Sequence, residues 1–356
     1  MTQQLTHPNR IAAFDLARGL AVFFMATVHA LGIYANPETY DSVFGWVVEF
    51  FGSAPAAPVF MFLMGAVIAF SRRAGFVTML RRGIALLALG YLLNTLRGSL
   101  PMWIAIQAGV SLEELGGATP LTELLSVDIL QFAGMAYLTL AVVRRITRNP
   151  WIWIALAAVV ACVSPLIWGF ETGVPVLDGV FSLLGGGDGE NVSFPLVAWI
   201  AYPLVGMAVG TWLATTDDVG KSFRRLALAG TGLLIIGGAI TLTNIDFHIG
   251  DYWRTGPGGV VLITGFVLLW LSGCQAIASR VLLTGPGKLL AFWSRNVTVF
   301  YFIHWVLLGW SVLLVGYESY GVLGTLIGMV VIVLLGTGLT QVWVRLRKLT
   351  RRERKP

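Results

Sequence analysis

The sequence predicts an all-α integral membrane protein, with about ten transmembrane helices in one bundle and both termini cytoplasmic. Three observations lead to this fold class. Of the 356 residues, 56% are hydrophobic and only 12% are charged, whereas soluble chains contain about 25% charged residues. Ten apolar segments approach or exceed the about 20 residues that cross a bilayer as a helix. Lysine and arginine also gather at alternate ends of these segments, as expected when a chain crosses a membrane repeatedly.

The ten apolar segments account for most of the chain. We expect the transmembrane helices at residues 11–35, 46–71, 81–97, 127–145, 150–169, 194–214, 223–243, 257–279, 289–315 and 320–344. The third segment is the shortest of them. The stretch Leu100–Val110 that follows it is too short to span the bilayer as a helix, so we expect it to be interfacial or re-entrant.

The positions of the basic residues predict the orientation of the chain. With the N-terminus in the cytoplasm, twenty of the 24 lysine and arginine residues fall on the cytoplasmic side, where positive charge is normally in excess. The predicted domains are a membrane domain at 1–344 and a basic cytoplasmic tail at 345–356. The net charge of +6 comes largely from residues that flank the spans, so the lipid bilayer is the expected partner and nucleic acid is not.

The first segment carries Asp15, Arg18 and His29 within an otherwise apolar run. An ionisable side chain costs ~2.5 kcal/mol or more in the bilayer core and is usually functional there. A helix places all three on one face, with Arg18 and His29 roughly 16 Å apart along its axis. We expect Arg18 to bind an anionic ligand and His29 to accept a proton, since imidazole titrates near neutrality. The alternative is an Asp15–Arg18 ion pair and a structural histidine.

Further polar side chains occur in or beside later spans. His304 and Tyr301 lie one helical turn apart, and a site role for His304 is as well supported as a structural one. Arg295 and Asn296 lie at the cytoplasmic end of the same span. At the start of the fourth span Asp128 is expected to cap the helix, which leaves Gln131, one turn further in, as a candidate site residue.

A predicted outer loop at Asn244–Arg254 combines acidic, aromatic and imidazole side chains. His248, Asp251, Tyr252 and Trp253 suit a sugar, because aromatic faces pack on C–H surfaces and polar groups bind hydroxyls. The alternative is an amphipathic loop in an interfacial aromatic belt. No metal site is expected, since the four histidines have no close ligand spacing.

Several stretches together resemble a known group of membrane enzymes. The first span reads R-I-A-A-F-D-L-A-R-G-L-A at 10–21 and continues to His29. This pattern resembles that of the transmembrane acyltransferase superfamily, which includes acyltransferase-3 proteins and heparan-alpha-glucosaminide N-acetyltransferase-like membrane proteins. Segments 60–73, 127–138, 194–210 and 287–305 fit the same resemblance in order.

The resemblance implies a multi-pass enzyme, with a bacterial inner (plasma) membrane as the expected location. It would move an acyl group, most simply acetyl, from cytoplasmic acyl-CoA to a hydroxyl or amine of a cell-envelope carbohydrate or glycolipid. His29 would be the catalytic base, and Arg18, Arg295 and Asn296 would bind acyl-CoA. Asp15, Gln131, Tyr301 and His304 would be supporting residues; His248, Asp251, Tyr252 and Trp253 would bind the acceptor. Acyl-CoA is then a substrate, and no bound cofactor is expected.

One departure from the superfamily bears on the mechanism. The sugar N-acetyltransferase branch has its active histidine in the loop after the first span, but Asn36–Asp41 contains no histidine. This favours direct transfer with His29 as base over an acyl-histidine route. Two other classes stay open. One is a carrier for an anionic or polyol solute, against which no inverted repeat is evident; the other is an export or scaffold component without chemistry.

Overall fold

The computed structural model describes residues 11–71, 75–113, 115, 117–170, 172–185 and 192–353. Most of these residues are helical, and no β-strand occurs among them. The first ten residues of the predicted membrane domain and the last three of the predicted tail lie outside the described residues. Ten helical stretches in the described part are long and apolar enough to cross a membrane. The predicted all-α membrane fold is therefore confirmed, while the orientation of the termini stays a prediction.

Each predicted span corresponds to one of these ten stretches. They are Ala12–Tyr34, Val43–Phe70, Phe76–Gln107, Ile129–Ile146, Pro150–Ile167, Leu196–Ala214, Val219–Thr241, Pro257–Val281, Val297–Val315 and Val322–Thr350.

The third stretch differs from the prediction. Instead of a short span at 81–97 followed by an interfacial segment, helix α5 (Phe76–Asn94) continues through the π-helical turn η1 (Thr95–Ser99) into α6 (Leu100–Gln107). Pro101 falls at the start of α6, where the missing amide hydrogen is tolerated. The wider π turn joins the two apolar runs into one helix. Hydropathy alone had separated these two runs at residues 97–99.

Two other predicted spans contain breaks. The second consists of α3 (Val43–Gly52) and α4 (Ala57–Phe70), which are separated by a turn. The predicted span at 289–315 is divided into α16 (Gly285–Arg295) and α17 (Val297–Val315). Asn296 ends α16, and its side-chain Nδ2 donates to the carbonyl oxygen of Phe292 at 2.9 Å. The Asn296 side chain thus satisfies one of the terminal carbonyl groups of α16 at the break.

The chain divides into two compact units. Unit 1 contains residues 57–92 and 125–281 together with the described residues before Arg18; unit 2 contains 18–56, 93–124 and the chain from Leu282 onward. The boundary falls within α1 (Ala12–Tyr34).

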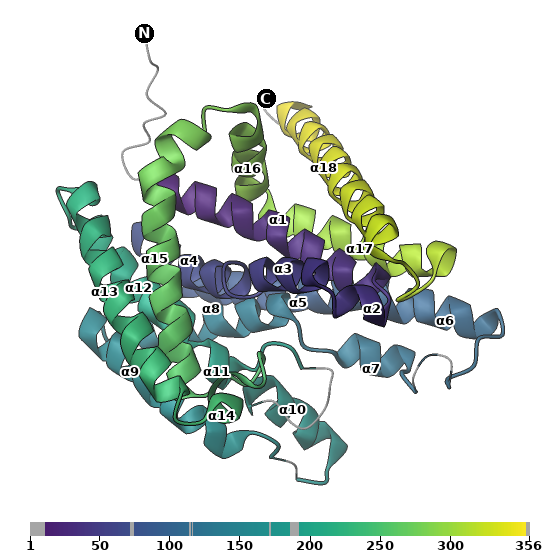
Figure 1. Ribbon diagram of the computed structural model, residues 1–356, viewed down its shortest axis with the longest axis horizontal. Coiled ribbons are helices and arrows are strands. Elements are labelled where there is room, and N and C mark those ends of the chain that lie inside the picture. The colour runs from purple at the N-terminus through teal and green to yellow at the C-terminus, as the bar shows by residue number, and fades with distance from the viewer. Residues whose placement is uncertain are drawn as a thin grey trace. The chain divides into compact units, whose positions relative to one another are not determined.

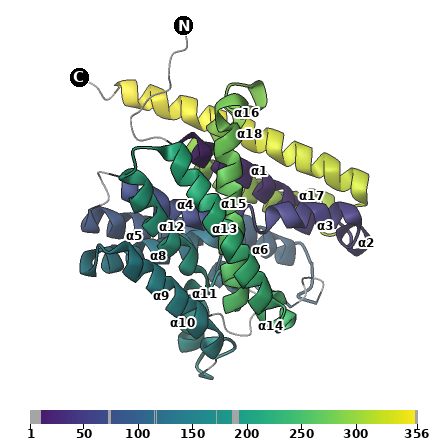
Figure 2. The same cartoon turned by 60° about the vertical axis from the view of Figure 1, so that its left-hand side comes forward.

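In unit 1, the long helices α13 (Val219–Thr241) and α15 (Pro257–Val281) run side by side, as Figures 1 and 2 both show. Helix α12 (Ala201–Ala214) packs against α4 and α9 (Pro150–Val163).

Helix α8 (Ile129–Ile146) begins with a capping box in which Asp128 and Gln131 are reciprocal partners, so the predicted cap at Asp128 is confirmed. The shorter helices are α10 (Pro175–Gly185), α11 (Leu196–Trp199) and α14 (Ile245–Ile249).

The core of unit 2 joins the second half of α1 to α17 and to α18 (Val322–Glu353). Leu31, Leu308, Met329 and Ile332 belong to one buried cluster there. The end of α1 is also bonded to the loop before α18, since the amide of Tyr320 donates to the carbonyl of Tyr34 at 2.8 Å. The shorter helices of this unit are α2 (Pro37–Tyr40), α3, α6, α7 (Pro120–Leu125) and α16. These contacts fix the part of α1 that carries His29 against α17.

The α4–α12 contact yields a stability prediction. A Cβ atom at Gly206 would clash with the backbone carbonyl of Phe62, so Gly206→Ala should lower the free energy of unfolding by about 1–3 kcal/mol, as overpacking does. Thermal unfolding in detergent measures the effect. Gly232→Ala in α13 is the matched control, because a Cβ there meets nothing within 4 Å; an equal loss in both variants would contradict the packing argument.

Candidate functional site

Two histidines that are distant in the sequence form a hydrogen-bonded pair in unit 2. Nδ1 of His29 on α1 lies 3.0 Å from Nε2 of His304 on α17, and the two rings are within 7° of parallel. His304 is fully buried, with an exposed fraction of 0%, whereas His29 is partly exposed. His29 is therefore the more accessible member of the pair.

The hydrogen bonds of His304 determine which nitrogen of each neutral ring carries the proton. Nδ1 of His304 lies 3.1 Å from the carbonyl oxygen of Phe300, and a carbonyl only accepts, so this Nδ1 must be the donor. The neutral His304 ring then accepts at Nε2, and His29 must donate to it from Nδ1. The lone pair of neutral His29 is consequently on Nε2, as a general base requires.

Aromatic rings surround the pair. The ring centroid of Trp305 lies 4.2 Å from that of His29, and Tyr301 meets both histidines edge to face, at 6.3 Å from His29 and 5.3 Å from His304. Arg97 adds a positive charge, since its Cζ lies 4.2 Å from the Trp305 ring centroid in a cation–π contact. The guanidinium and the imidazole of His29 thus contact the same indole.

The π-helical turn η1 holds Arg97 at this position. The indole Nε1 of Trp310 donates to the carbonyl of Leu96 at 2.9 Å, and the hydroxyl of Ser99 donates to the carbonyl of Pro120 at 2.7 Å. Gly309 lets η1 approach α17, because a Cβ there would clash with the carbonyl of Arg97. Single π turns within helices are frequent at functional sites, which agrees with the role that the neighbouring histidines suggest.

The arrangement can remove a proton from a weak nucleophile. His29 supplies the basic nitrogen, His304 fixes its orientation, and Arg97 supplies a cation beside apolar rings, where its field is screened less than in water. The sequence prediction included His29, Tyr301 and His304 but missed Arg97 and Trp305. The only sequence signal for Arg97 was a single arginine at the end of an apolar segment.

The residues predicted to bind acyl-CoA lie in the first half of α1 and at the break between α16 and α17. Arg18 is partly buried in unit 2, about three turns before His29 on α1, while Asp15 falls in the part of α1 that belongs to unit 1. Arg295 is exposed at the last residue of α16, and Asn296 follows it at the break before α17. These roles stay predictions.

The remaining predicted site residues belong to unit 1. Gln131 Oε1 accepts from the amide of Asp128 at 3.3 Å, as part of the capping box. In the segment after α14, Asp251 accepts from the amide of Trp253 at 2.8 Å and pairs with Arg254. His248 Nδ1 accepts from the amide of Gly258 at 3.1 Å, and burial raises the pKa of Tyr252 well above its usual value. The acceptor-binding role of this segment stays a prediction.

Comparison with known proteins agrees with the resemblance noted from the sequence. The family model Acyl_transf_3, described as an acyltransferase domain, matches residues 11–341. A search of curated proteins found no match. The matched range contains His29, His304 and Arg97, as well as Arg18.

The hydrogen bonds predict the tautomer of each of the three described histidines. In their neutral forms, His29 and His304 should both carry the proton on Nδ1, whereas His248 should carry it on Nε2 because its Nδ1 accepts the Gly258 amide. Nitrogen-15 NMR of histidine-labelled protein measures this, with His29→Asn, His304→Asn and His248→Asn variants for assignment. An Nε2-protonated His29 would contradict the arrangement.

Proposed function

The chain belongs to the acyltransferase-3 family and is a multi-pass membrane acyltransferase; we propose that it transfers an acyl group, most simply acetyl, from cytoplasmic acyl-CoA to an extracytoplasmic carbohydrate. The observation that carries the proposal is the His29–His304 hydrogen bond. With this bond in place, the lone pair of the neutral His29 imidazole is on Nε2, where it can act as a base. A sugar hydroxyl needs such a base because it is a poor nucleophile. The family also favours acyl transfer over the carrier alternative.

In the proposed reaction, Nε2 of His29 takes the proton of the acceptor hydroxyl while the oxygen attacks the thioester carbonyl carbon. The carbon–oxygen bond forms, and negative charge develops on the former carbonyl oxygen, where Arg97 would stabilise it. The carbon–sulfur bond then breaks, and the CoA sulfur leaves with the proton from His29. Product formation returns His29 to its neutral form. The transfer is direct and needs no acyl-histidine, because the acceptor oxygen itself attacks the thioester.

The donor would lie along the first helix. Arg18 and His29 are separated by roughly 16 Å on one side of α1, so an elongated donor can place its phosphates at Arg18 and its thioester near His29. Arginine binds phosphate through paired donors. Arg295 and Asn296 would add contacts at the same end, and the basic cytoplasmic side would attract the polyanionic donor.

The acceptor would approach from the opposite side. Within unit 1, Asp251 would bind hydroxyls of the carbohydrate, and Tyr252 and Trp253 would pack on its C–H faces. A cell-envelope glycan or glycolipid fits this chemistry. The location that follows is a plasma membrane, with the bacterial inner membrane as the expected case.

A direct assay tests the proposal. Purified protein receives radiolabelled acetyl-CoA, and free CoA is measured with and without an envelope glycan extract. We expect CoA release that depends on the extract, together with label in the glycan. No labelled glycan from a folded preparation, combined with uptake of labelled solute by proteoliposomes, would favour a carrier instead.

His29→Ala should lower turnover about 10²–10⁴-fold, the usual contribution of a general base. His304→Gln should cause a smaller loss and change the pH profile, because it alters the orientation of the base and leaves the base in place. The assay is CoA release by protein whose thermal unfolding matches that of the native chain. Full activity in a folded His29→Ala variant would exclude the base role.

Arg18→Lys should raise the Michaelis constant for acyl-CoA more than it lowers turnover, since lysine cannot reproduce the guanidinium fork. Arg280→Lys is the matched control, as an exposed arginine near the end of α15. Unchanged acyl-CoA affinity in Arg18→Lys would assign Arg18 a structural role instead.

A further inference from the structure

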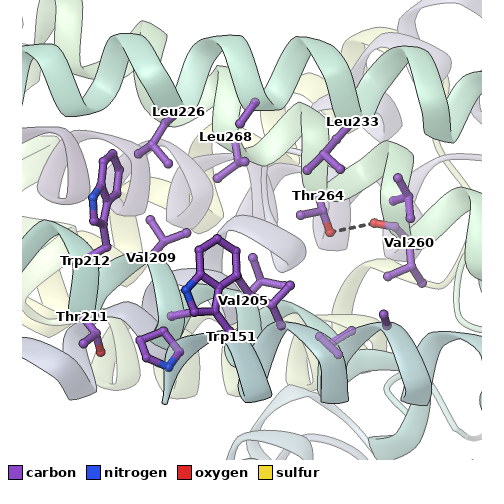
Figure 3. Close-up of a pocket in the computed structure, with 18 of the residues that line it drawn as sticks. Trp151, Val205, Val209, Thr211, Trp212, Leu226, Leu233, Val260, Thr264 and Leu268 are labelled. Atoms are coloured by element: carbon purple, nitrogen blue, oxygen red, sulfur yellow. Dashed lines mark hydrogen bonds between the residues drawn. The ribbon is translucent and has the colours of Figure 1, made fainter. Parts of the chain in front are cut away.

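A deep apolar recess in unit 1 is not used by the proposed reaction. It lies between α9, α12, α13 and α15 and encloses about 670 Å³ (Figure 3). That volume falls within the roughly 300–1,000 Å³ of typical small-molecule sites. Part of its wall is the protein interior, because Ala161, Ala208 and Val260 are buried side chains. It therefore differs from the helix faces elsewhere whose apolar side chains are exposed.

The wall of the recess favours an apolar ligand. Its threonine hydroxyls donate within their own helices: Thr264 bonds the carbonyl of Val260 at 2.7 Å, the bond drawn in Figure 3, and Thr211 bonds that of Met207 at 2.8 Å. Alanine, valine and leucine side chains form most of the remaining surface. A polar ligand would lose its bonds to water there without replacement, whereas a hydrocarbon chain would gain dispersion contacts.

One end of the recess is basic and aromatic. Among the described residues that line it, Arg225 is the charged one, and it lies in the second turn of α13. Trp151, in the first turn of α9, and Trp212, in the last turn of α12, also line the recess. Tryptophan and arginine together at helix ends are typical of the boundary between hydrocarbon and head groups. The mouth thus has the charge and polarity to bind an anionic head group.

We propose that this recess binds an anionic phospholipid, with one acyl chain in the apolar part and the phosphate at Arg225. The guanidinium offers paired donors to a phosphate, and each basic residue near a membrane surface favours anionic lipid. Its lining includes none of the residues that the proposed reaction uses.

The test is native mass spectrometry of the full-length protein in detergent, with added phosphatidylglycerol or phosphatidylcholine of identical chains. We expect one retained phosphatidylglycerol, bound about fivefold more tightly than phosphatidylcholine. Arg225→Gln should remove this preference, while Arg224→Gln, at an adjacent exposed arginine that does not line the recess, should keep it.

Two further variants test the recess itself. Ala229→Trp and Ala158→Phe each place a bulky side chain at its rim, from α13 and α9 respectively, and either should abolish retention of both lipids. Both positions are exposed and lie on different helices, so a variant that fails to fold at one position leaves the other for the test. Thermal unfolding verifies that each variant is folded. Equal retention of both lipids, equal effects of Arg225→Gln and Arg224→Gln, or undiminished binding in a folded rim variant would overturn the proposal. Displacement of phosphatidylglycerol by an equal concentration of palmitoyl-CoA would do the same, since it would assign the recess to the donor's chain.

Discussion

The hydrogen bond between His29 and His304 is the interaction on which the candidate site depends. A backbone carbonyl, that of Phe300, orients the buried His304, and His304 in turn orients His29. Each step follows from the fact that a carbonyl accepts and cannot donate. An isolated imidazole in an apolar helix would have neither a defined tautomer nor a fixed ring position. Two helices that are far apart in the chain therefore have to pack together before either histidine has a chemical role.

The packing of unit 2 is arranged so that this contact can form. The end of α1 is bonded through Tyr34 to the loop before α18, and α1, α17 and α18 share one buried cluster. Gly309 and Trp310 on α17 contact the π turn that carries Arg97. Helix α17 thus carries the orienting histidine and contacts the turn that carries Arg97. A change in its position would disturb base, orientation and charge at once, which makes it the structural centre of the proposed reaction.

The sequence predicted the ten spans, the cap at Asp128, and both members of the histidine pair as separate candidates. Hydropathy identifies spans well, because a bilayer leaves helices few alternatives. The hydrogen bond between the histidines could not be predicted, since 275 residues separate them and periodicity describes only local structure. The position of Arg97 beside Trp305 was not predicted, because a π turn cannot be recognised in a hydropathy pattern. The same limit explains the third span, which was expected to end near Arg97 and instead continues to Gln107.

The central claim is that the base serves a donor from the cytoplasm and an acceptor from the opposite side. Acyl-CoA and an acceptor glycan added outside sealed right-side-out vesicles that carry the protein in their membrane test this most directly, with labelled glycan as the readout. We expect no transfer while the vesicles are sealed, and transfer once they are opened, because the donor would then reach the basic cytoplasmic side. Transfer by intact vesicles, with leakage excluded, would show that the donor enters from the other face and would contradict the proposed mechanism.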